Sequence, residues 1–185
     1  MIASAQIARR VIAALNTAEI AHVLVGAFAR NYYAEPRSTR DADIVISTAT
    51  GGLRPFLETL GSDFRMDEQL AFETNTGTLK NVLVHPDSGF VIELFSLSRD
   101  AHDQERFKRR RATTYESQPT FVLTAEDYII TKLRWPRSKD FDDARDVIAL
   151  QGGALDWNYI HHWADIHDSR AKLDRVRASI PPRRK

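Results

Sequence analysis

The sequence predicts an α+β (mixed α/β) core that is followed by a helical part. Three observations lead to this class: strand and helix patterns alternate over residues 3–60, a hairpin pattern occupies residues 79–95, and helical patterns fill most of residues 124–178. We therefore expect a core over residues 1–123 and a helical C-terminal part, residues 124–185, that packs on this core.

Helices and strands alternate in the first part of the chain. The run His22-Val23-Leu24-Val25 is typical of a short strand, and Ile44-Val45-Ile46 is the apolar segment of a buried one. In chain order we expect a helix (about 3–16), a strand (22–25), a helix (28–34), a strand (41–47) and a helix (52–60).

A hairpin and several helices follow. Pro86-Asp87-Ser88-Gly89 has the residues of a tight turn and separates the apolar runs 79–85 and 90–95. Thr124 and Asp127 have the spacing of a helix N-cap and its acidic partner, and this helix must end near Pro136. We also expect a helix at 101–109, strands at 111–115 and 120–123, and helices over most of 124–178.

Two aspartates open the strand that contains Ile44-Val45-Ile46. Because side chains alternate along a strand, Asp41 and Asp43 point to the same face. Two carboxylates held close together repel each other and lose water, so a cation between them stabilises the pair. Mg²⁺ is the expected cation, since it prefers oxygen ligands and is often shared with substrate phosphates.

Small residues precede this pair at a strand-to-helix junction. Gly26-Ala27 would let phosphate oxygens approach backbone amides and the positive end of the following helix. Arg37 and Arg40 add positive charge that can pair with the same phosphates. The stretch from Gly26 to Asp43 therefore predicts a site for metal ions and a triphosphate.

These residues resemble a known signature. Gly26-Ala27, followed after 13 residues by Asp41-Ala42-Asp43, is similar to the motif of the nucleotidyltransferase superfamily, which includes DNA polymerase beta and antibiotic nucleotidyltransferases. The segment Arg37-Ser38-Thr39-Arg40 resembles that of the minimal bacterial members and of AbiEii-type toxins, which usually have two glycines or Gly-Ser where this chain has Gly26-Ala27.

The resemblance implies a short mixed sheet flanked by helices, a nucleoside triphosphate as donor, and two Mg²⁺ ions, with Mn²⁺ as an alternative. It also implies a third carboxylate on a later strand, as general base or further metal ligand. The implied metal and catalytic residues are Asp41, Asp43 and Glu93, and the implied nucleotide-binding residues are Gly26, Ala27, Arg37, Thr39, Arg40 and Lys132.

Glu93 is chosen as the third carboxylate because it is the only charged residue inside the apolar run 90–95. A charge in such a strand is costly unless it is paired or binds a metal. Asp87 is a weaker candidate, since a turn aspartate already has a local role. Glu93 as a half-exposed residue of an edge strand is the alternative.

Lys132 lies at the edge of the apolar helix face formed by Ile129, Ile130 and Leu133. By the resemblance it binds the nucleotide phosphates, and Asp143 or Asp146 positions Lys132 or the acceptor. Lys132 as a lysine that only snorkels at the rim of the helix is the alternative. The aspartates of the following helix alternate with basic residues, so we expect most of them to form a solvated face; they are Asp140, Asp142, Asp143 and Asp146.

Composition fits an ordinary globular enzyme, with 43% hydrophobic and 28% charged residues. There are no cysteines and no apolar run long enough to cross a membrane, so we expect a cytoplasmic protein without a membrane partner. The stretch Arg106–Arg111 is strongly basic. One interpretation is that it contacts a nucleic-acid backbone, with Phe107 packed against a base. The favoured interpretation is that it is a solvated helix end.

Three functions compete. The favoured one is a Mg²⁺-dependent nucleotidyltransferase that transfers a nucleoside monophosphate to a hydroxyl of an RNA such as tRNA or of a protein, as in toxin systems, where an antitoxin would be a partner. The second has the same chemistry with a small acceptor such as an aminoglycoside. The third is a catalytically silent protein that binds a nucleotide or a partner; retention of three costly carboxylates argues against it.

Overall fold

The structure is a computed structural model that describes residues 4–48, 52–67, 69–73, 77–135 and 137–181. The chain forms two compact units. The first, called the sheet unit here, consists of Met1–Phe28 and Ser38–Leu123. The second, called the helical unit, consists of Ala29–Arg37 and Thr124–Lys185.

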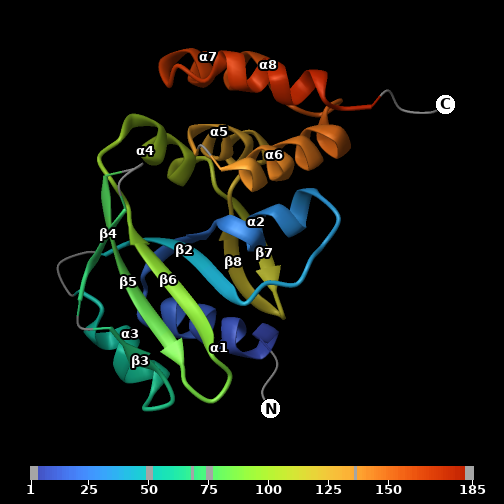
Figure 1. The fold of residues 1–185 in the computed structure, drawn as a ribbon. Coiled ribbons are helices and arrows are strands. Elements are labelled where there is room, and N and C mark those ends of the chain that lie inside the picture. Colours follow the sequence, from blue (N-terminus) through green and yellow to red (C-terminus); the bar gives the residue numbers. More distant parts are fainter. Residues whose placement is uncertain (1–3, 49–51, 68, 74–76, 136, 182–185) are drawn as a thin grey trace. The chain divides into compact units, whose positions relative to one another are not determined.

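The sheet unit is built on an eight-stranded mixed sheet with the strand order β3-β5-β6-β2-β1-β8-β7, in which β4 also pairs with β5 (Figure 1). Strand pairs β2–β6 and β1–β8 are parallel, and the other pairs are antiparallel. The strands are β1 (Ala21–Leu24), β2 (Asp41–Ser47), β3 (Arg65–Met66), β4 (Ala71–Glu73), β5 (Thr78–His85), β6 (Phe90–Ser96), β7 (Arg111–Tyr115) and β8 (Gln118–Val122).

The helices found among the described residues of the sheet unit are α1 (Ser4–Thr17), the start of α2 (Gly26–Tyr33), α3 (Arg54–Leu60) and α4 (Ala101–Lys108). Helices α1 and α3 lie on the same side of the sheet (Figure 1) and share its core. The apolar residues of β2 and β6 that point to this side are each no more than 2% exposed; they are Ala42, Ile44, Ile46, Phe90, Ile92 and Leu94. Alternate positions of the two strands therefore belong to the opposite face.

The helical unit contains the rest of α2 together with α5 (Ala125–Arg134), α6 (Ser138–Gln151), α7 (Trp157–Ile166) and α8 (Arg170–Ala178). Thr124 is the N-cap of α5, where its hydroxyl accepts a hydrogen bond from the Asp127 amide at 3.1 Å, as the sequence predicts. Ile129, Ile130 and Leu133 are fully buried, which confirms the predicted apolar face. Within the part of the chain that the structure describes, no helix is long and apolar enough to span a membrane.

The predicted class is confirmed, and most elements lie where the sequence places them. Strands β2 and β7 have the predicted bounds, and residue 3 of the first predicted helix lies outside the described residues. Strands β3 and β4 were missed because two and three residues carry no alternation pattern and depend on pairing with β5. The predicted division at residue 124 stays a prediction, and the segment Ala29–Arg37 groups with the C-terminal helices.

Candidate active site

An acidic face is formed on the sheet by β2 and β6. The two strands are parallel and in register, with Asp43 opposite Glu93 and Ala42 opposite Ile92. Since Ala42 and Ile92 point into the core, Asp43 and Glu93 point to the other face, and Asp41 lies two residues before Asp43 on that same face. The strand register therefore brings the three predicted carboxylates to one side of the sheet.

Asp43 packs against the first residue of α2. Gly26 has a φ of +55°, in the left-handed region, and a Cβ at this position would lie 1.9 Å from Asp43 Oδ2 and 2.9 Å from Asp43 Cβ. The backbone adds a second link, because the Val25 amide donates a hydrogen bond to the Asp43 carbonyl at 2.9 Å. Glycine is thus required at residue 26 for both its backbone angle and the space that Asp43 occupies. Ala27, the next residue of α2, is half-buried.

Asp41 is exposed at the start of β2, and its carboxylate accepts a hydrogen bond from the Thr39 hydroxyl. The preceding residue, Arg40, is anchored through its backbone, since its carbonyl accepts a hydrogen bond from the Val91 amide at 3.2 Å. The side chain of Arg40 is exposed. The Thr39 side chain therefore orients Asp41, and the main-chain bond of Arg40 fixes the start of β2.

Glu93 lies on the inner strand β6, which rules out the edge-strand alternative. Its Oε1 is 2.7 Å from the Lys80 ammonium, and the Glu93 side chain is 27% exposed. The other candidate, Asp87, is exposed in the turn between β5 and β6. Glu93 is thus the carboxylate that shares a sheet face with Asp43, and its charge is balanced by Lys80.

The donor set fits Mg²⁺. Carboxylate oxygens are the hard ligands that this ion prefers, and Asp41 and Asp43 offer them from one strand end with Glu93 on the neighbouring strand. The close approach of Asp43 to Gly26 keeps that carboxylate next to the start of α2, where backbone amides favour anions. These residues can therefore hold a metal ion together with phosphate oxygens.

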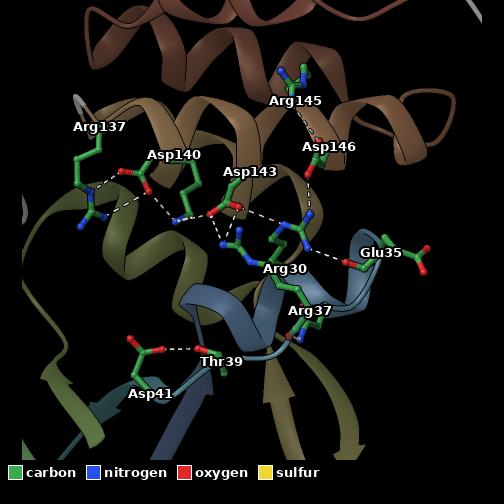
Figure 2. A network of polar contacts seen from close by, with 12 residues as sticks. Arg30, Glu35, Arg37, Thr39, Asp41, Arg137, Asp140, Asp143, Arg145 and Asp146 are labelled. Carbon is green, nitrogen blue, oxygen red and sulfur yellow. Dashed lines mark hydrogen bonds and ion pairs between the residues drawn. The ribbon is translucent and has the colours of Figure 1, made fainter.

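The two predicted phosphate ligands of the helical unit, Arg37 and Lys132, both contact Asp143. Figure 2 shows the contact between Arg37 and Asp143. Arg37 Nη2 lies 2.8 Å from Asp143 Oδ1, and Lys132 Nζ lies 3.1 Å from Asp143 Oδ2. Arg30 Nε also lies 3.2 Å from Asp143 Oδ1. Asp143 is only 2% exposed, so it is a buried carboxylate surrounded by three cations.

The network extends on both sides of Asp143. Arg30 contacts Asp146 at 2.6 Å and the Glu35 carbonyl at 2.7 Å, while Asp140 accepts from Lys132 at 2.7 Å and from Arg137 at 2.6 Å (Figure 2). Burial alone would raise the pKa of Asp140, but the hydrogen bonds from Arg137 and Lys132 outweigh it and hold this pKa below its usual value.

This arrangement corrects the expectation of a mostly solvated acidic face on α6. Asp140 and Asp143 are buried at 0% and 2% exposure, and only Asp142 of the four aspartates is fully on the surface. Burial also raises the pKa of the neighbouring Tyr128 hydroxyl, with a further contribution from Asp143. The inner side of α6 is therefore a paired polar core and not a solvated face.

The basic stretch at the end of α4 is also used internally. Arg106 is 6% exposed and lies 2.9 Å from Asp103. The Arg110 guanidinium lies over the rings of Phe107 and Phe121, at 4.3 and 4.7 Å from their centres. Phe107 is 7% exposed, so the suggested stacking of this ring on a base is wrong, and the stretch is not a simply solvated helix end.

Two contributors were missed by the sequence reasoning. Lys80 is close to Glu93 because the hairpin register pairs Val82 with Glu93, which places Lys80 diagonally across on the same face. The turn at residues 86–89 fixes this register, so the hairpin prediction contained the signal. Arg30 offered none, since its partner Asp146 is 116 residues further along the chain.

Comparison with known proteins gives matches at the level of structure. No protein-family model matches the chain, and no curated protein matches its sequence. The antibiotic-resistance factor ANT(2'')-Ia in complex with adenylyl-2''-tobramycin superposes with a TM-score of 0.59 at 14% identity, over 90% of this chain and 98% of that one. Its solution structure gives a TM-score of 0.55 at 14% identity, over 94% and 96%.

A nucleotidyltransferase-like protein from Paracoccidioides brasiliensis, described as antigenic, superposes with a TM-score of 0.52 at 18% identity, over 95% of this chain and 94% of that one. These matches span nearly the full length of both partners. The chain therefore has the nucleotidyltransferase fold, as the sequence motif predicts.

Proposed function

We propose that this protein is a Mg²⁺-dependent nucleotidyltransferase that transfers a nucleoside monophosphate from a nucleoside triphosphate to a hydroxyl group. One observation carries the proposal: within a nucleotidyltransferase fold, Asp41, Asp43 and Glu93 share one face of the sheet, and Asp43 lies against the glycine that starts α2. Fold alone does not define a function, and it is this acidic face that supplies the chemistry.

Each carboxylate has its own role in the proposal. Asp41 and Asp43 would hold two Mg²⁺ ions, with Mn²⁺ as an alternative, and Glu93 would be a further ligand on the side of the attacking hydroxyl. When bound, such ions lower the pKa of the attacking hydroxyl and stabilise the leaving pyrophosphate. Glu93 accepts the hydroxyl proton as the oxygen bonds to the α-phosphorus and the bond to pyrophosphate breaks. Thr39 holds Asp41 in a fixed orientation through its hydrogen bond.

In the sheet unit, the proposed phosphate ligands are Gly26, Ala27 and Arg40. Gly26 and Ala27 offer the first amides of α2, and Arg40 has an exposed guanidinium. Arg37 and Lys132 remain proposed phosphate ligands. Asp143 contacts both cations, and exposure of 48% of the Arg37 side chain leaves it accessible to a phosphate.

Two acceptor classes follow from different observations. The structural similarity to ANT(2'')-Ia bound to adenylyl-2''-tobramycin favours a small hydroxylated molecule such as an aminoglycoside. An RNA such as tRNA, or a protein, is the acceptor if the chain is a toxin with an antitoxin partner. The case for RNA is weaker than the sequence suggested, because Arg106 and Arg110 are occupied by Asp103 and by aromatic rings.

The proposal is tested by incubating the protein with Mg²⁺ and each α-³²P-labelled nucleoside triphosphate in three arms: total RNA, a panel of aminoglycosides, and the protein alone. Label on an acceptor in one arm identifies its class. Asp43→Asn should lose at least about 100-fold in rate, since it removes a charge that acts in the transition state. No label in any arm, at any triphosphate, would support the silent binding protein instead.

A matched pair of variants separates the two candidates for the third carboxylate. Glu93→Gln changes the residue on the acidic face, and Asp87→Asn makes the same kind of change in the exposed turn of the same hairpin. We expect Glu93→Gln to reduce transfer strongly and Asp87→Asn to leave it within about twofold. The reverse result would assign the role to Asp87.

A further inference from the structure

Lys80 forms an ion pair with Glu93 diagonally across the hairpin. Its ammonium lies 2.7 Å from Glu93 Oε1, and the two side chains are 22% and 27% exposed. Lys80 also lies 5.5 Å from the centre of the Phe95 ring, which it faces directly in the strand register. The ammonium is therefore held over β6 by a carboxylate and by an aromatic face.

The position of this pair matters because of Asp43. The β2–β6 register sets Asp43 directly beside Glu93, so two carboxylates occupy neighbouring positions on one face. Like charges at such a spacing destabilise each other, and a nearby cation relieves the repulsion. Lys80 supplies that cation from within the chain, at the carboxylate proposed to complete the metal site.

We propose that Lys80 is the resident counter-cation of Glu93, which a divalent ion must displace before Glu93 can act as a metal ligand. Lys80 is then a positioning residue: it keeps Glu93 on the acidic face while the metal is absent, and it sets the metal concentration at which the site fills. This inference rests on the proposed function, because it assumes that Glu93 serves the metal site.

Removal of a counter-cation and removal of a purely structural lysine should change the metal affinity in different directions. A divalent ion beside Glu93 is repelled by the ammonium and competes with it for Oε1, so removing the positive charge should tighten metal binding by about tenfold. A lysine that merely supported the hairpin would, when removed, leave metal affinity unchanged or weaken it. Lys80→Arg keeps the charge and should stay within about twofold of the wild type.

The experiment is a titration of the full chain with Mn²⁺ alone, with free Mn²⁺ followed by electron paramagnetic resonance. The variants are Lys80→Met, Lys80→Arg, Asp43→Asn and a matched control, Lys108→Met, which removes the same charge from an exposed position of the sheet unit. Lys80→Met should bind Mn²⁺ more tightly than both the wild type and Lys108→Met. Thermal unfolding of each variant confirms that the compared proteins are folded.

The outcomes distinguish a failure of the proposed function from a failure of the proposed role of Lys80. If the wild type binds no Mn²⁺, or binds it equally well after Asp43→Asn, the proposed function fails whatever Lys80 does. If Asp43→Asn abolishes binding while folded Lys80→Met binds Mn²⁺ no more tightly than Lys108→Met, the counter-cation role of Lys80 is overturned and the proposed function stands. Should Lys80→Met fail to fold, Lys80→Gln, which keeps a polar end without the charge, takes its place in the same comparison.

Discussion

The carboxylate of Asp43 occupies the space that a side chain at residue 26 would need. Gly26 stands at the first position of α2 with φ at +55°, and an added Cβ would lie 1.9 Å from Asp43 Oδ2. Two independent features therefore require glycine at residue 26: its backbone angle and the Asp43 side chain on the neighbouring strand. A glycine kept only for its backbone angle would have empty space at the Cβ position, and here that space is filled by a proposed metal ligand.

Gly26→Ala should therefore damage the acidic face more than the fold. The backbone strain costs about 1 kcal/mol, and the clash must in addition displace the Asp43 carboxylate. We expect transfer activity to fall by at least about 100-fold, because a displacement of about 1 Å at a catalytic group has effects of this size. Steady-state kinetics and Mn²⁺ affinity measure the loss, and thermal unfolding measures the stability.

Gly89→Ala is the matched control for this variant. Gly89 also has a positive φ, +67°, but nothing lies within 4 Å of an added Cβ. Its substitution should lower stability by a similar backbone cost while leaving Mn²⁺ affinity close to that of the wild type. Equal losses of Mn²⁺ affinity in the two variants would show that contact with Asp43 is not what makes Gly26 special.

Thr39→Val tests whether the hydroxyl that contacts Asp41 orients this carboxylate. Valine keeps the shape of threonine and removes the donor, so Asp41 becomes free to rotate. We expect kcat to fall by about tenfold with little change in the thermal midpoint, since Asp41 is exposed and a lost surface hydrogen bond contributes about 1 kcal/mol or less. Thr39→Ser retains the donor and should restore most of the rate; a serine variant as slow as the valine one would contradict this role.

The sequence predicts a site residue well when the segments that position this residue are close to it in the chain. Asp41, Asp43 and Gly26 lie in one short stretch, so alternation along a strand and the demands of a tight turn were sufficient to group them. Glu93 was expected from the resemblance to nucleotidyltransferases and from its charge in an apolar run, and it lies beside Asp43 because β6 pairs with β2. Local rules thus predicted the aspartate pair and the glycine, but not the strand pairing that completes the acidic face.

The polar core of the helical unit could not be predicted by such rules. Alternating charges on α6 suggest solvent, but Asp143 is buried because Arg30, Arg37 and Lys132 reach it from other segments. The pattern of charges on α6 does not reveal which face of the helix contacts those cations. A carboxylate is stable in a buried position only when such cations pair with it. Tertiary pairing therefore decided the burial of this face.

Asp143→Ala should be among the most destabilising single changes in the helical unit. It leaves Arg30 and Lys132, with side chains 6% and 12% exposed, without a shared carboxylate. Loss of one partner from a buried ion pair costs about 3–5 kcal/mol. Asp142, on the same helix, pairs with Arg145 at the surface, and the Asp142 side chain is 59% exposed. Asp142→Ala should therefore cost about 1 kcal/mol or less.

Thermal and urea unfolding of the Asp143 and Asp142 variants measure this difference. A common midpoint for both would mean that the network around Asp143 adds no more than a surface pair does, and the buried-pair interpretation would then be wrong. Asp143→Asn is a useful intermediate, because it keeps the shape and part of the hydrogen bonding while removing the charge.

His22 should make the sheet unit sensitive to mild acid. The residue is 2% exposed, and its ring lies between the Ile20 carbonyl and the Thr120 hydroxyl, each at 3.0 Å. Burial lowers the pKa of His22 from 6.5, with a smaller lowering from the Arg110 charge; the Ile20 carbonyl opposes them. Below pH 6.5 the unfolded chain therefore takes up a proton at His22 that the folded chain does not, so stability falls as the pH falls from 6.5 toward the lowered value.

His22→Gln removes this titration while keeping a polar group of similar length. The variant should be less stable than the wild type at about pH 7.5, since it cannot satisfy both partners of the ring, but it should lose less stability between about pH 7.5 and 5.5. Urea unfolding at the two pH values gives the difference for each protein. If the wild type and His22→Gln lose the same free energy over this interval, His22 is not the group that couples folding to acid, because a neutral glutamine takes up no proton in either state.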